Sequence, residues 1–360
     1  MKIGIFTFHC AHNYGAMLQA YALQTYLISQ GNDAYIVDYR PKYFFKFYRP
    51  HSWAHWLSKK PSKTLKKLIS EPFLFRERTK RWNAFNEFHL NKYKLYDYNK
   101  IKESKFDLLI FGSDQIWNKQ LTNNSFDDNY WATGFNCPCI SYAASMGNKP
   151  SEEDFSTIAR LLKNFKHISV RESDLVSQLS VLINKPISLT CDPVFLLSKE
   201  EWANICTPLQ NKKPYVLCYN LQKSQECRNV AEMISNEKGY EIKEIIGYIS
   251  YDASPDALLS IGPAEFISYF LNASFIVTSS FHGTAFSLIF EKNFYTVGVK
   301  SAKGRITSLL TMLGLQNRMH SPKSSRDITS VDYLDANKRL EAYINMSMEY
   351  LNSVTTTSYY

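Results

Sequence analysis

The sequence predicts an α/β protein made of two domains, each built on a parallel sheet. At 360 residues and 45% hydrophobic content, the chain can bury a large core and is long for one compact unit. Short apolar segments alternate with helical segments in two separate series, which is typical of parallel strands joined by crossover helices. Residues 197–213, where Ser, Thr, Pro and Gln are mixed, separate the two series and are predicted to join the domains.

The first series opens with a strand, a turn, a helix and a second strand, predicted at residues 2–8, 9–15, 16–29 and 34–39. Ligands of parallel α/β sheets bind beyond the carboxyl ends of the strands, so we expect the turn to face a cleft. Asn13 and Tyr14 are polar groups that it would present there, although Asn13 would equally serve as the helix cap. Gly15 stands alone, so the turn is not a dinucleotide-binding fingerprint.

Charged residues follow the later strands of this first series. The strands are predicted at 106–111, 139–144, 167–171 and 187–190, with a helix at 173–180. Asp114 could cap the next helix, face the cleft, or do both. Arg171 could present its planar guanidinium to a carboxylate or phosphate, or pair with an acid such as Glu172. Asp192 follows the last strand, in Cys-Asp-Pro.

Basic and aromatic residues are concentrated between positions 40 and 105. This segment carries 18 Lys and Arg against 5 Asp and Glu, whereas the net charge of the whole chain is +9. Such a mixture suits contact with an anionic membrane surface. Nucleic acid is not expected as a partner, because no recognition motif accompanies the charge. The segment can equally be a helical insertion, mostly at 62–89, with aromatic residues in the core and a solvated charged face.

The second series repeats the alternation and predicts a second parallel α/β domain. Its strands are expected at 215–220, 242–246, 275–277 and 294–297, and its helices at 224–236, 263–271, 284–290 and 306–313. A last helix at about 331–351 carries apolar residues on one face and is expected to cross back onto the first domain.

The stretch ASFIVTSSFHGTAFSLIFE, residues 273–291, combines a buried strand, a polar turn and a helix that starts at Gly283. The unpaired N–H groups and the dipole of a helix start form an anion site. His282 would lie at its mouth, beside the hydroxyls of Ser279 and Ser280. A lone turn histidine is commonly only structural, but its place at the carboxyl end of a strand favours a function.

Other classes of protein and site are disfavoured by the sequence. Met1 leads directly into a strand, and no apolar run reaches about 18 residues, so we expect a cytoplasmic protein without a spanning helix. The seven cysteines are scattered and odd in number, which suggests reduced core residues. Cys137 and Cys139 form the only close pair, and no second pair with zinc spacing follows, so no metal site is predicted.

Several stretches, taken in order, resemble the polysaccharide pyruvyl transferase family over nearly the whole chain. They are KIGIFTFHCAHNYGAMLQAYALQ, FDLLIFGSDQIWN, ISYAASMG, ISVRES, LTCDPVFLL, FIVTSSFHGTAFSLIF and GRITSLLTMLGL. The resemblance implies two Rossmann-like domains facing each other across a cleft, as in GT-B glycosyltransferases. The first would span 1–198, with the insertion at about 40–105, and would be joined by the C-terminal helix 331–352. The second, donor-binding domain would span 210–325. The implied activity is transfer of pyruvate from phosphoenolpyruvate to a sugar, as a cyclic ketal, without a further cofactor.

Two functional residues of the family have a match in this sequence, and a third does not. The resemblance matches a family histidine to His282 and a family arginine to Arg171. Where many members carry another arginine, this chain has Ser280; Arg305 is the candidate replacement, and Lys303 or Lys300 could also serve.

The implied reaction assigns the candidate residues to three roles, which are catalysis, donor binding and acceptor binding. The donor needs cations and backbone N–H groups, and both proton transfers suit an imidazole. The predicted catalytic residues are His282 and Asp114. The predicted donor-binding residues are Arg171, Arg305, Ser280, Gly283 and Lys303. The predicted acceptor-binding residues are Asn13, Tyr14, His12 and Asp192.

The expected acceptor is a galactose-type residue of a lipid-linked surface polysaccharide, which would bring the basic insertion to the inner face of the membrane. Two other functions stay open from the sequence. One is a GT-B glycosyltransferase that uses a nucleotide sugar. The other is a non-catalytic assembly factor that binds glycan or membrane through residues 40–105.

Overall fold

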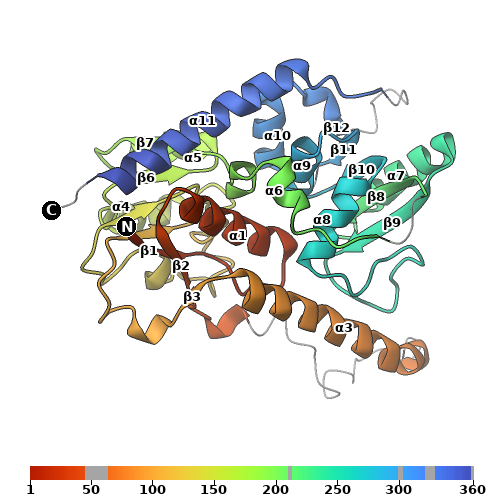
Figure 1. Cartoon of the computed structure of the whole chain (residues 1–360), viewed down its shortest axis with the longest axis horizontal. Coiled ribbons are helices and arrows are strands. Elements are labelled where there is room, and N and C mark those ends of the chain that lie inside the picture. The colour runs from red at the N-terminus through yellow and green to blue at the C-terminus, as the bar shows by residue number, and fades with distance from the viewer. Residues whose placement is uncertain (45–63, 210–212, 299–302, 321–328, 358–360) are drawn as a thin grey trace.

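The computed structural model describes residues 1–44, 64–209, 213–298, 303–320 and 329–357, with the backbone alone for 64–69 and for Lys303. Two α/β units lie side by side, and both have parallel sheets (Figure 1). The predicted fold class, two Rossmann-like units with a helical insertion in the first, is therefore confirmed.

The first unit is built on a five-stranded sheet of order β3-β2-β1-β4-β5, in which all neighbours are parallel. Its strands are β1 (Lys2–Phe6), β2 (Asp33–Val37), β3 (Leu95–Tyr96), β4 (Leu108–Phe111) and β5 (Cys139–Ser141). Two more parallel strands, β6 (Ile168–Val170) and β7 (Ile187–Leu189), continue from β5 through isolated bridges. The helices are α1 (Tyr14–Ser29), α4 (Phe155–Leu162) and α5 (Ser173–Ser180).

The second unit has a sheet of order β12-β11-β10-β8-β9, also parallel throughout. Its strands are β8 (Tyr215–Asn220), β9 (Glu241–Ile246), β10 (Phe275–Thr278), β11 (Phe294–Val297) and β12 (Met319–His320). Its helices are α7 (Gln225–Lys238), α8 (Pro263–Asn272), α9 (Phe281–Ile289) and α10 (Lys303–Met312), and the short α6 (Lys199–Ala203) lies in the connection between the units. Helix α9 starts at Phe281, so His282 lies within its first turn rather than in a turn before it.

The last helix, α11 (Leu334–Thr356), runs from the second unit back over the first (Figure 1). Ser347 Oγ accepts a hydrogen bond from the backbone N–H of Cys191 at 2.8 Å, and the hydroxyl of Tyr350 donates to the carbonyl of Ser141 at 2.8 Å. The two units also share one core across their boundary, where the ring of Tyr14 stacks on Phe266 with centroids 4.6 Å apart. These contacts fix how the cleft walls face each other.

The insertion contributes the long helix α3 (Thr64–Lys92), which lies along both units (Figure 1). Phe85 and Phe88 are buried, so these rings belong to the core, whereas Phe73 and Phe75 are 57% and 41% exposed. The aromatic and basic residues at 45–63, on which the membrane prediction also drew, lie outside the described residues. Within the described parts of the chain, every helix is too short or too polar to cross a bilayer.

Candidate functional site

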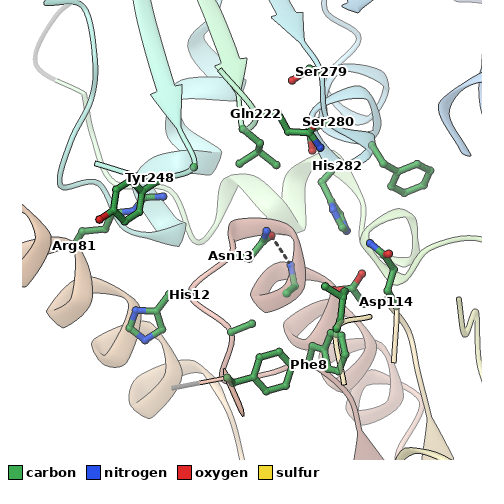
Figure 2. A pocket seen from close by; sticks show the side chains of 18 of the residues that line it. Phe8, His12, Asn13, Arg81, Asp114, Gln222, Tyr248, Ser279, Ser280 and His282 are labelled. Atoms are coloured by element: carbon green, nitrogen blue, oxygen red, sulfur yellow. Dashed lines mark hydrogen bonds between the residues drawn. The ribbon is translucent and has the colours of Figure 1, made fainter. Parts of the chain in front are cut away.

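A cavity of about 520 Å³ opens between the two units, where β1, β4, β8 and β10 end (Figure 2). The first unit lines it with Phe8, His12, Asn13 and Asp114, and α3 adds Arg78, Arg81 and Trp82. The second unit lines it with Gln222, Tyr248, Ser279, Ser280, His282 and Arg305. Parallel strands place ligands beyond their carboxyl ends, so this is the candidate active site.

His282 is held between the two units and is 8% exposed. Its Nε2 lies 3.5 Å from Oδ2 of Asp192, and its ring lies against the start of α1. A Cβ atom on Gly15 would come within 2.1 Å of Nδ1 of His282, so only glycine permits this close approach. Figure 2 shows the imidazole reaching from the second unit toward Asp114 and the start of α1.

Asp192 stands behind His282 and is only 1% exposed. Arg171 Nη1 donates to its Oδ2, and the backbone N–H of Val194 donates to Oδ1 at 3.1 Å. Burial disfavours the charged carboxylate, but the nearby His282 and Arg171 outweigh burial and hold the pKa of Asp192 well below its usual range. Asp192 is therefore an anion that can orient the imidazole and stabilise its protonated form.

Arg171 lies at the centre of a buried charge cluster, which we define as Asp114, Arg171, Glu172, Asp192 and His282. Its Nη2 is 3.8 Å from Asp114 Oδ1 and its Nε is 3.7 Å from Glu172 Oε1. Burial alone would lower the pKa of Arg171, but the three carboxylates outweigh burial and raise it. Arg171 is 6% exposed and pairs with acids, which was the alternative to binding a ligand that the sequence left open. Its guanidinium also lies 4.8 Å from the ring centroid of Phe281.

Asp114 connects this cluster with the cavity, which its side chain lines. Its φ of 65° is left-handed, a conformation that aspartate tolerates better than most residues. Such backbone conformations are most frequent at functional sites.

Only some of the remaining predicted donor-binding residues line the cavity. Arg305 lines the cavity together with Ser280, and its guanidinium lies 6.0 Å from the ring centroid of Phe281. Burial and the charge of Arg171 lower the pKa of Arg305. Gly283 is buried and packs tightly on Thr278, so it does not line the cavity. The side chain of Lys303 lies outside the described residues.

Two of the four predicted acceptor-binding residues, Asn13 and His12, line the cavity. Asn13 lines the cavity and its Oδ1 accepts a hydrogen bond from the backbone N–H of Ala16 at 3.3 Å, so it both caps α1 and faces the cleft. His12 lines the cavity with its ring centroid 4.0 Å from that of Trp82, and burial lowers the pKa of His12 to about 4.

The other two predicted acceptor-binding residues, Tyr14 and Asp192, do not line the cavity. Tyr14 is 1% exposed, and its hydroxyl donates to the carbonyl of Ile261 at 3.0 Å. Its role is therefore to join the two units rather than to contact a ligand. Asp192 is likewise absent from the cavity wall among the described residues, because His282 stands in front of it.

Sequence reasoning missed the part of α3 that lines the cavity. Arg81 Nη1 donates to the carbonyl of Ile246 at 2.9 Å, and Arg78 Nη1 to that of Ile249 at 3.4 Å. Arg78, Arg81, Trp82 and Phe85 recur at helical spacing on one face, and this was the available signal.

The site is a cavity between two Rossmann-like units, with an imidazole backed by a carboxylate. The chain belongs to the polysaccharide pyruvyl transferase family, whose description, "Polysaccharide pyruvyl transferase", matches residues 13–301. The family makes it a transferase enzyme of polysaccharide biosynthesis with a polysaccharide acceptor.

No curated protein matches the chain. Among solved structures it is similar to the S. aureus MnaA-UDP co-structure, with 12% identity, 99% of both chains covered and a TM-score of 0.45. It is also similar to the UDP-GlcNAc 2-epimerase from Methanocaldococcus jannaschii, with 11% identity, 96% of this chain and 93% of that chain covered and a TM-score of 0.44. The Streptomyces sp. SF2575 glycosyltransferase SsfS6 matches with 12% identity, 97% and 96% coverage and a TM-score of 0.40. These likenesses carry no conclusion about activity.

Proposed function

We propose that this enzyme transfers the pyruvyl unit of phosphoenolpyruvate to two hydroxyls of a sugar and releases phosphate. The observation that carries the proposal is the meeting of two helix starts, α1 from the first unit and α9 from the second, beside His282 at one cavity. Each helix start offers unpaired N–H groups and a partial positive charge. With Arg305 on the same wall, the site suits a compact donor that carries a carboxylate and a phosphate.

The reaction requires a proton carrier at the donor. A sugar hydroxyl adds to C2 of phosphoenolpyruvate and loses its proton, while C3 gains a proton and becomes a methyl group. The bond between C2 and the phosphate oxygen then breaks, and a second hydroxyl attacks C2, its proton leaving with the phosphate. In this proposal His282 delivers the proton to C3, because Asp192 stabilises the imidazolium from behind. Asp114, on the cavity beside it, accepts the proton of the first hydroxyl.

The acceptor enters along α3 in this proposal. His12 and Trp82 offer aromatic rings on that wall, packed on each other at an angle of 37°, and Arg78 and Arg81 add positive charge. A galactose-type sugar attached to a lipid would suit this wall, and the exposed rings of Phe73 and Phe75 on the same helix would then meet the membrane surface. Sedimentation with anionic vesicles, weakened by salt, is the test of that contact.

The decisive experiment is incubation with phosphoenolpyruvate and a panel of galactosides, followed by phosphate measurement and mass spectrometry of the sugar. We expect equal amounts of phosphate and pyruvylated sugar, and a loss of turnover of about 100-fold or more in His282→Gln. His167→Gln, at an exposed position beside β6, is the matched control and should keep full turnover. If nucleotide sugars raise the melting temperature while phosphoenolpyruvate does not, the glycosyltransferase alternative replaces the proposal.

A further inference from the structure

A second group of chemically active side chains lies under α3, apart from the buried charge cluster. His9 follows β1, Asp38 follows β2, and His89 lies near the end of α3. One nitrogen or oxygen atom from each of the three lies within 4.8 Å of the other two. The group joins three elements that are distant in the sequence, so it exists only in the folded chain.

The distances within this group suit a shared ion. His9 Nε2 lies 3.0 Å from Asp38 Oδ1. In a tetrahedral zinc site, two ligands bonded at about 2.1 Å lie about 3.4 Å apart, which is close to this distance. The three atoms lie within 4.8 Å of one another, which is wider than a bonded tetrahedral set, so the side chains would move closer together around an ion.

Hydrogen bonding accounts for both ring nitrogens of His9 and leaves Nε2 of His89 without a partner among the described residues. His9 Nδ1 donates to the carbonyl of Thr7 at 3.1 Å, and its Nε2, when it carries a proton, donates to Asp38 Oδ1 at 3.0 Å. A metal ion can replace the proton on Nε2 and be shared by the nitrogen and the carboxylate, because metal ligands bind in their deprotonated form. A proton would satisfy that pair alone. His89, 5% exposed, adds an Nε2 that is buried and makes no hydrogen bond to any described residue, so a third acceptor remains.

We propose that His9, Asp38 and His89 bind one divalent transition-metal ion such as Zn²⁺. Two imidazoles and one carboxylate select this class over Mg²⁺ and Ca²⁺, which prefer oxygen ligands. Outer contacts of the expected kind are already present: the Thr7 carbonyl fixes the ring of His9, and Arg40 Nε donates to Asp38 Oδ1 at 2.6 Å.

The bound ion would pin α3 to the ends of β1 and β2. His89 follows Trp82 by about two helical turns and therefore lies on the same side of the helix. The helix face that the ion holds is thus the face that presents Arg81 and Trp82 to the cavity. This role is one of positioning, and it does not depend on which donor the enzyme uses.

The test is metal binding by the untagged full chain. After removal of metal with a chelator, titration with Zn²⁺ should show about one site per chain, and Mg²⁺ should not compete. His89→Gln should weaken Zn²⁺ binding by about 100-fold or more, because loss of a direct ligand exceeds the effect of outer-shell changes. His167→Gln, which removes an exposed histidine of the same unit, should bind as the unchanged chain does.

A second readout keeps the proposal open to refutation if the variant folds poorly. Zn²⁺ should raise the melting temperature of the unchanged chain and leave that of His89→Gln where it was. Failure of the unchanged chain to bind Zn²⁺ saturably, or equal binding by His89→Gln, overturns the site. The proton that bridges His9 and Asp38 would then be the whole explanation of that contact.

Discussion

The two sides of the cavity are built on different principles. On the side of His282, the charged groups contact one another. Arg171 binds Asp192, Asp192 lies behind His282, and Asp114 lies at the end of the cluster that faces the cavity. On the side of α3, Arg78 and Arg81 each donate to a backbone carbonyl of the second unit, while Arg78 also pairs with Glu71. The guanidinium of Arg81 lies 5.1 Å from the ring centroid of Tyr14. The first side is fixed by buried charges that pair with one another, whereas the second side meets the other unit mainly through backbone carbonyls, as suits proton chemistry on one side and a variable sugar on the other.

Energetics support this contrast. Desolvation makes buried ion pairs poor contributors to net stability, yet removal of one partner is strongly destabilising. The buried charge cluster is therefore best explained by the positions it imposes rather than by the stability it adds. The hydrogen bonds that the guanidinium groups of Arg78 and Arg81 donate to backbone carbonyls contribute about 1.5–3 kcal/mol each.

Removing the central cation tests the fixed side most severely. Arg171→Met should leave three neighbouring carboxylates without their shared partner and lower the free energy of unfolding by about 3–5 kcal/mol. Chemical denaturation measures this change. Arg160→Met, at an exposed position of α4, should stay within about 0.5 kcal/mol of the unchanged chain. If both variants lower the free energy of unfolding equally, the buried charge cluster does not depend on Arg171 to hold its carboxylates in place.

Gly15→Ala tests the contact between the units without removing a charge. Its Cβ would lie 2.1 Å from Nδ1 of His282, so the imidazole must move away from Asp192 and the cavity. We expect the chain to fold and kcat to fall about 100-fold, since displacement of a reacting group by about 1 Å has effects of this size. Gly304→Ala adds a methyl group that meets no atom of the described residues within 4 Å, and it should keep its kcat. Unchanged turnover in Gly15→Ala would separate His282 from the chemistry.

The fold was largely predictable because apolar strands and helices alternate regularly. β8 (Tyr215–Asn220) and β11 (Phe294–Val297) have the predicted bounds. The missed strands, β3 and β12, have two residues each, and two residues carry no periodicity. Both lie at sheet edges, where pairing is decided by the tertiary structure rather than by local pattern.

The site was predictable where its chemistry is local in the sequence. His282 drew attention because a strand, hydroxyl groups and a helix start surround it within a few residues. Asp192 could not be placed behind it, since the two residues come from different units and meet only after folding. The same holds for Gly15, whose contact with His282 no pattern within one unit reveals.

Arg78→Met tests the side of the cavity formed by α3 and should have the smallest effect of the three. The Nε of Arg78 is buried without a hydrogen bond to any described residue, and burial lowers the pKa of this guanidinium, so an anionic or hydroxyl-rich acceptor would gain a donor there. We expect the KM for the sugar acceptor to rise about tenfold, or about 1.4 kcal/mol, with the KM for phosphoenolpyruvate unchanged. Arg76→Met changes an exposed arginine of the same helix and should alter neither constant. A rise in both KM values for Arg78→Met would show that the two sides act as one, and the distinction between a donor wall and an acceptor wall would have to be abandoned.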